Sequence, residues 1–104
     1  MISTSLEGKK LAVTINEDVI STSVDRLHGE ILEQMNNNKA WDELHVDLTK
    51  TGRVDSMGIN MLVMILSETK RRGAIMSAAV LEGMVYDALL FTRLDRQIKL
   101  TVKR

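Results

Sequence analysis

The stretch Leu44–Asn60 reads LHVDLTKTGRVDSMGIN, and it predicts a strand, a loop and the start of a helix in that order. The apolar run over residues 44–48 is short and bounded, as in a buried strand. Residues 49–53 include a glycine and are typical of a loop. An unbroken helical pattern then runs from Met57 to Arg72, so this segment sets a strand–loop–helix unit at the centre of the chain.

Asp55 and Ser56 stand at the junction of this loop and helix, and both are good N-cap residues. A hydroxyl at a helix N-terminus lies where the backbone favours an anion. We therefore expect Ser56 to gain and lose a phosphate, although a plain N-cap is the simpler interpretation of the same residue. Asp55 is either the cap or a group that orients the Ser56 hydroxyl. Thr49 and Thr51 are alternative hydroxyls on the loop.

The flanking segments predict further strands and helices. Two apolar alternations predict strands at 11–15 and 98–102, and residues 2–6 are expected as an edge strand. Three- and four-residue spacings predict a helix over 24–35 and a third one from Met84 to Phe91. The remaining elements are a buried strand at 74–81 and an N-cap for the first helix at 21–23.

The resulting order, β-β-α-β-α-β-α-β, predicts an α/β fold. Strands that alternate with helices pair in parallel through right-handed crossovers. We expect a mixed, largely parallel sheet of four to five strands with helices packed on it. Residues 1–104 are expected to form a single domain, since 104 residues suffice for one modest core.

Charge and composition argue against several classes of function. The formal net charge is zero, so no long-range field favours nucleic acid or an anionic membrane. There is no cysteine, and His28 and His45 have no ligand spacing, so we expect no metal and no cofactor. A magnesium site from Asp47 and Asp55 is a weak alternative. The N-terminus lacks the features of a signal peptide, and we expect a cytoplasmic monomer.

The helix that follows Ser56 divides into two faces. The first face is expected to pack on the sheet and comprises Ile59, Leu62, Ile65, Leu66 and Thr69. The second face is expected either to be an exposed stripe for a partner or to be buried like the first. It comprises Met57, Asn60, Met61, Met64 and Glu68.

Two further features of this helix have open interpretations. Gly58 either lets another chain approach closely or relieves crowding under the preceding loop. The basic residues 70–72 are expected to be a solvated helix end that complements the helix dipole. Gly73 is expected to stop the helix in a left-handed conformation.

Leu44–Asn60 resembles the strand–loop–helix signature of the STAS domain, best known from bacterial anti-sigma factor antagonists. In that signature Asp-Ser-small-Gly opens the second helix, and here the segment Asp55–Gly58 stands there with Met57 at the small position. Residues 71–74 are similar to the family's helix exit, and residues 89–95 to its third helix and following turn. The resemblance extends more weakly to the N-terminal strand and helix.

This resemblance implies a partner-switching protein and not an enzyme. In the family a serine-kinase anti-sigma factor binds the unphosphorylated domain and phosphorylates the signature serine, here Ser56, and a PP2C-type phosphatase removes the phosphate. The residues expected to bind the partner are Asp55, Ser56, Met57, Gly58, Asn60, Met61 and Met64. The alternatives are a non-phosphorylated STAS scaffold or accessory subunit of a larger assembly, and a STAS module that binds lipid or another small ligand.

Overall fold

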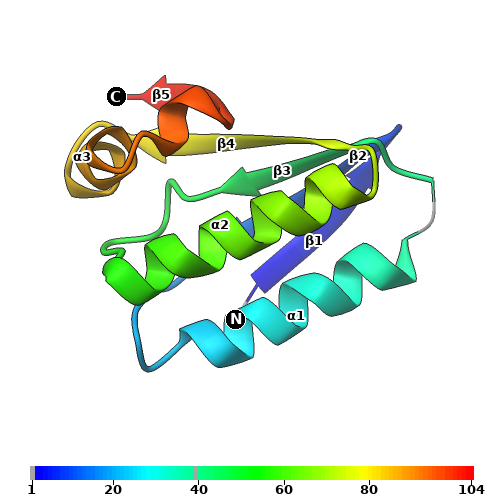
Figure 1. The fold of residues 1–104 in the computed structure, drawn as a ribbon, viewed down its shortest axis with the longest axis horizontal. Helices are drawn as coiled ribbons and strands as arrows, with labels where there is room; N and C mark the ends of the chain where they lie inside the picture. The colour runs from blue at the N-terminus through cyan, green and yellow to red at the C-terminus, as the bar shows by residue number, and fades with distance from the viewer. Residues whose placement is uncertain (1, 39) are drawn as a thin grey trace.

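The computed structural model describes residues 2–38 and 40–104, which form one five-stranded sheet with helices packed on it (Figure 1). The order of elements is the one that the sequence predicts, with one short 3₁₀ helix added. In chain order they are β1 (Ile2–Glu7), β2 (Lys10–Ile15), α1 (Val24–Asn37), β3 (Glu43–Asp47), α2 (Ser56–Arg71), β4 (Ile75–Leu81), α3 (Met84–Phe91), η1 (Leu94–Arg96) and β5 (Lys99–Lys103).

The strands lie in the sheet in their order along the chain, β1-β2-β3-β4-β5. β1 pairs with β2 in antiparallel fashion, and the other three pairings are parallel. Val13 on β2 lies opposite Val46 on β3, which in turn lies opposite Ala78 on β4. The predicted α/β class, with a mixed and largely parallel sheet, is therefore confirmed.

Alternation along the strands separates a buried face of the sheet from a more open one. On β2, Leu11, Val13 and Ile15 are fully buried, whereas the residues between them are half-buried. α1 and α2 lie side by side over the buried face (Figure 1). Val85 and Leu89 of α3 belong to the same hydrophobic core.

α2 buries a wider stripe than the sequence predicts. Leu62 and Ile65 are at most 1% exposed, as expected for the face on the sheet. Met61 is also buried, with only 2% of its surface exposed, so at this position the buried alternative holds and the exposed one does not. The reason is that α1 packs alongside α2, and Met61 lines a shallow groove between the two helices together with Val24 and His28.

The ends of the helices show how the local sequence sets the boundaries. Gly73 follows α2 with a φ of 75°, which confirms the left-handed stop. Ser23 precedes α1, but its hydroxyl makes no cap hydrogen bond to the helix. It instead accepts the Ile20 N–H and donates to the Asp18 carbonyl, so it stabilises the β2–α1 loop. Within the described residues, no helix combines the length and the apolar character needed to cross a membrane.

Candidate functional site

The N-terminus of α2 is capped by Asp55, and this leaves Ser56 exposed. One carboxylate oxygen of Asp55 accepts the Gly58 N–H at 2.9 Å, as an N-cap does. The other oxygen accepts the Ser21 N–H, also at 2.9 Å. Ser56 is the first residue of the helix, and its side chain faces solvent. The Ser56 hydroxyl is therefore not needed to cap the helix and is accessible for modification.

The two N–H donors also set the charge state of Asp55. The Gly58 N–H, followed by the Ser21 N–H, lowers the pKa of the Asp55 carboxyl below its ordinary value, and the nearby Arg53 contributes in the same direction. The carboxylate is therefore ionised at neutral pH. Its negative charge complements the positive end of the α2 dipole directly beside Ser56.

The loop before α2 is held in place by the β2–α1 loop. Val19 and Val54 form an isolated parallel bridge between the two loops. The Val19 N–H donates to the Arg53 carbonyl at 2.9 Å, and the Asp55 N–H donates to the Val19 carbonyl at 3.2 Å. These bonds flank the cap and fix the position at which α2 begins.

Gly58 provides the space that this loop contact requires. A Cβ at position 58 would lie 2.1 Å from the Val19 carbonyl oxygen and 2.8 Å from Val54 Cγ1. Gly58 is buried by its own chain, and its expected contact with a partner stays a prediction. The second interpretation, relief of crowding under the loop, matches the geometry.

The two threonine hydroxyls of the β3–α2 loop are engaged within the chain. The Thr51 hydroxyl is buried and donates to the Ile15 carbonyl at 3.0 Å. The Thr49 hydroxyl donates to Asp47 at 2.6 Å, and the Thr49 N–H donates to the same oxygen at 2.8 Å. Of Thr49, Thr51 and Ser56, only Ser56 is exposed.

Asp47 is held by the same interactions. Its partial burial would raise the pKa, but the two Thr49 donors and the charge of Lys103 lower the pKa below the ordinary value. Asp47 thus accepts hydrogen bonds from Thr49, whereas Asp55 accepts them from Ser21 and Gly58, and in the part of the chain that the structure describes no hydrogen-bond donor is shared between the two carboxylates. The described residues contain no group of three or more histidine, aspartate or glutamate side chains that would hold a metal ion.

An exposed apolar surface extends from Ser56 along α2. Met57 and Met64 are 48% and 47% exposed, and Asn60 between them is also exposed. A shallow groove of about 90 Å³ separates these side chains from α1, and its lining residues are Val24, Asp25, His28, Met57, Asn60, Met61 and Met64. Met61 forms part of this groove from its buried position. We name Ser56, Met57, Asn60 and Met64 the α2 surface.

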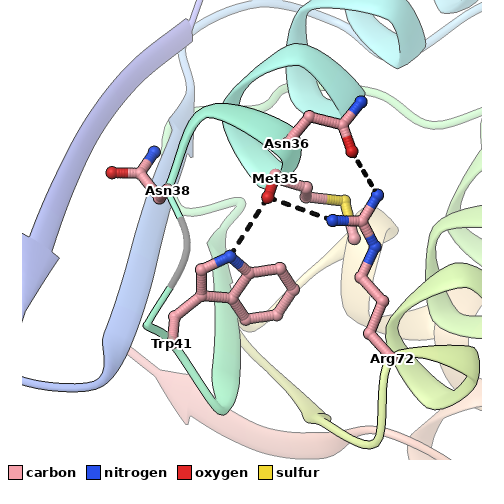
Figure 2. Close-up of a pocket in the computed structure, with 5 residues that line it drawn as sticks. All are labelled: Met35, Asn36, Asn38, Trp41 and Arg72. Atoms are coloured by element: carbon pink, nitrogen blue, oxygen red, sulfur yellow. Dashed lines mark hydrogen bonds between the residues drawn. The ribbon is translucent and has the colours of Figure 1, made fainter.

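A second polar cluster lies at the other end of the helices, and the sequence analysis missed it. Figure 2 shows the guanidinium of Arg72 donating to the Met35 carbonyl at 3.0 Å and to the Asn36 side chain at 2.5 Å. The Trp41 indole N–H donates to the same carbonyl at 3.2 Å, and the Arg72 guanidinium lies 6.0 Å from the ring centroid. Arg72 therefore ties the end of α1 to the end of α2, and is not only a solvated helix end. The lone tryptophan and the arginine before Gly73 were the available signals.

A hydrogen-bonded row on the open face of the sheet was also missed. Ser77 on β4 donates to Glu43 Oε2 at 2.6 Å, and its oxygen lies 2.7 Å from His45 Nδ1. Because the single Ser77 proton points to Glu43, the histidine N–H donates to Ser77. Burial, followed by the charge of Lys10, lowers the pKa of His45. His28 lies on α1, so the two histidines do not form a common site.

A family model and several solved structures are similar to this chain. The model described as "Mlab, STAS domain" matches residues 2–102. A candidate anti-sigma factor antagonist from Thermotoga maritima is 16% identical with a TM-score of 0.80, over 99% of this chain and 86% of that one. Unphosphorylated SpoIIAA is 10% identical with a TM-score of 0.79, over 100% and 89%. SpoIIAA, called a Bacillus cell fate determinant, is also matched in its phosphorylated form.

The same fold occurs inside a much larger protein. The murine anion transporter Slc26a9 is 15% identical with a TM-score of 0.79, over 92% of this chain but only 16% of the transporter. No protein with a curated description matches the chain by sequence. At these identities the solved structures show the fold alone.

Proposed function

This chain belongs to the STAS domain family, and from that membership we propose that it is a partner-switching protein of the anti-sigma factor antagonist type. Its unphosphorylated form binds a serine-kinase anti-sigma factor, and phosphorylation on Ser56 releases that partner. The observation that carries the proposal is the exposed Ser56 side chain, which the Asp55 cap leaves unused. The existence of SpoIIAA in phosphorylated and unphosphorylated forms, on the same fold, supports the analogy.

The kinase would dock on the α2 surface. Met57 and Met64 present flexible apolar side chains next to the serine, and methionine suits adaptable contacts. Asn60 lies between them and offers hydrogen-bonding groups at the centre of the contact. The Ser56 hydroxyl then lies at the rim, where a kinase that holds the α2 surface reaches it.

The phosphate would act on the interface and leave the fold intact. A phosphoserine adds about −1.5 to −2 charges, which the N-terminus of a helix tolerates. The Asp55 carboxylate already accepts the Gly58 N–H of the first turn, so this donor is not free to bind the phosphate. It would remain on the α2 surface, where it opposes a partner that presents an apolar or acidic contact.

The rest of the circuit follows from the same proposal. A PP2C-type phosphatase would restore the hydroxyl, and the protein itself would perform no catalysis. The circuit would operate in the cytoplasm on a kinase partner, without nucleic acid, membrane or cofactor. The segment that bears Ser56 is the element that both partner enzymes must recognise.

The proposal is tested by mixing the purified chain with a serine kinase of the anti-sigma factor type and with Mg-ATP. We expect a complex before ATP is added and one phosphate, on Ser56, afterwards. Calorimetric titration should show that the phosphorylated chain and Ser56→Asp lose at least ~10-fold in affinity, equivalent to about 1.4 kcal/mol. Ser67→Asp, a change of another exposed serine on α2, is the matched control and should bind like the wild type.

The second candidate function is a STAS scaffold within a larger assembly, and the match inside Slc26a9 favours it. In that case Ser56→Asp would form the same complex as the wild type, and incubation with the kinase would leave Ser56 unmodified. A lipid or other small molecule that co-purifies with the chain would favour the ligand-binding alternative.

A further inference from the structure

The two edges of the sheet differ in how they are protected. An edge strand exposes unpaired backbone groups, and charged side chains are a common means of preventing other strands from pairing there. The β5 edge carries Lys99 and Lys103, with Arg104 directly beyond the strand. The β1 edge has no charged residue between Ile2 and Leu6, where the sequence reads ISTSL.

The hairpin geometry shows which backbone groups of β1 point outward. Glu7 and Lys10 close a two-residue loop in which Gly8 has a φ of 64°, as in a type II′ turn. The closing pair of such a hairpin is hydrogen-bonded, and hydrogen-bonded and non-hydrogen-bonded pairs alternate along the strands. The N–H and C=O groups of Ile2, Thr4 and Leu6 therefore point away from β2, toward the free edge.

α1 covers a face of β1 and not this edge. The Thr4 hydroxyl contacts Gln34 of α1 at 3.3 Å, and Thr4 lies opposite the buried Val13 on the helix side of the sheet. Residues 3–7 are nonetheless exposed, and Leu6 retains 47% of its surface. The edge is thus accessible to another strand in the plane of the sheet.

We propose that β1 pairs in antiparallel fashion with β1 of a second copy of this chain, in a register centred on Thr4. The pattern ISTSL is self-complementary in that register. Ile2 lies opposite the second copy's Leu6, and each Thr4 lies opposite its equivalent. Because these are the residues whose backbone groups point outward, each pair exchanges both of its N–H···O bonds.

The side chains fit the same arrangement. Ile2 and Leu6 lie on the helix side, so their contact extends the hydrophobic core across the two-fold axis and covers the exposed Leu6. Ser3 and Ser5 lie opposite each other on the open face, where hydroxyls pair without like-charge repulsion. A symmetric contact of this kind closes after two copies. This dimer replaces the monomer that the sequence predicts.

The dimer leaves the α2 surface free. β1 lies at one edge of the sheet, whereas α2 connects β3 and β4 further into it (Figure 1). The proposal therefore does not depend on Ser56, and its failure would leave the proposed function untouched.

Sedimentation equilibrium of the purified chain from low micromolar to near-millimolar concentration tests this inference. We expect the average mass to double with rising concentration. Thr4→Pro should abolish the association, because proline removes the outward N–H at the two-fold axis without removing a β1–β2 bond. Its thermal unfolding, followed by circular dichroism, checks that the fold remains.

A cross-linking variant identifies the register independently. The chain contains no cysteine, so Thr4→Cys introduces a single thiol. Opposed residues of a hydrogen-bonded pair lie about 5.5 Å apart between Cα atoms, within the range of a disulfide. Mild oxidation should give a covalent dimer of Thr4→Cys and little of Thr101→Cys, on the β5 edge. A chain that stays monomeric throughout, or a dimer that survives Thr4→Pro, would overturn the proposal.

Discussion

At the scale of single residues, the position of α2 depends on Gly58. No side chain fits at this point, because the Val19 carbonyl and the Val54 side chain approach its backbone closely. Both neighbours belong to the bridge between the two loops that frame Ser56. Gly58 therefore helps to fix the position of Ser56 at the start of α2.

Replacing Gly58 by alanine should destabilise the protein by about 2 kcal/mol, since overpacking at a rigid backbone contact forces the loops apart. Gly29→Ala is the matched control. It lies in the middle of α1 with open space around its Cβ and should stabilise the protein by about 0.5–1 kcal/mol. Urea unfolding of the two variants measures both effects. Equal behaviour of the two would show that the contact at Val19 does not constrain the loop.

Asp55 should make the stability of the protein depend on pH in the acid range. Its folded-state pKa lies below the ordinary value of 3.8, so its stabilisation is present above that value and is lost as the pH falls through the folded-state pKa. Asp55→Asn keeps an N-cap oxygen but cannot titrate. Unfolding midpoints measured from pH 6 down to ~2 should therefore fall less steeply for Asp55→Asn than for the wild type. Parallel curves would contradict the capping role of the carboxylate.

The exposed methionines should determine affinity for the kinase with little effect on stability. We expect Met57→Ser together with Met64→Ser to weaken the complex at least ~10-fold, because central apolar contacts dominate most interfaces. Ile75→Ser is the control. Ile75 is 55% exposed, but it begins β4 just after the C-terminal end of α2, whereas the α2 surface begins at the N-terminal end of that helix. Calorimetric titration of the variants gives the result. An equal loss for Ile75→Ser would place the contact elsewhere.

At the scale of elements, the sequence predicts the strands and helices well because their patterns are local. The alternation of Leu11, Val13 and Ile15 and the spacing of Leu62 and Ile65 each follow from one element and its buried face. Met61 could not be placed in this way, because its burial depends on α1, whose position relative to α2 has no local signal. The bridge between Val19 and Val54 also joins two loops that are distant in the chain.

The sequence predicts the position of the candidate site but not which residue caps the helix there. Ser56 and Asp55 are adjacent at the start of a strong helical pattern, so the position of the hydroxyl follows from the sequence. Which of the two caps the helix does not follow, since both side chains are suitable. The Ser21 N–H decides in favour of Asp55, because it comes from a separate loop and binds the second carboxylate oxygen. The hydrogen bond from the Thr51 hydroxyl to the Ile15 carbonyl likewise joins residues that are far apart in the chain, so the sequence does not predict it.

Arg72 tests how the ends of the two long helices are held together. Arg72→Ala should cost about 1–2 kcal/mol, since it removes charge-assisted bonds to the Met35 carbonyl and the Asn36 side chain. Arg71→Ala is the neighbouring control. Arg71 is 71% exposed and bonds Glu68 on its own helix, so its loss should change the unfolding midpoint little. Two equal changes in thermal stability would argue against a link between the helices.

At the scale of the whole molecule, the fold separates three surfaces. The α2 surface lies at the N-terminus of α2, the β1 edge lies at one side of the sheet, and the Arg72 cluster joins the opposite ends of α1 and α2. A dimer through β1 would carry two α2 surfaces and could hold two kinase molecules. The proposed switch and the proposed dimer are therefore independent, and each can be removed by its own substitution.

In the proposed switch, a phosphate on Ser56 decides whether the partner binds. The decisive measurement is phosphosite mapping by mass spectrometry, after incubation with a serine kinase of the anti-sigma factor type and Mg-ATP, followed by titration of the same sample against fresh kinase. We expect one phosphate, on Ser56, absent from Ser56→Ala, together with loss of the complex. A phosphate on Thr49 or Thr51, or a fully phosphorylated chain that still binds the kinase, would contradict it.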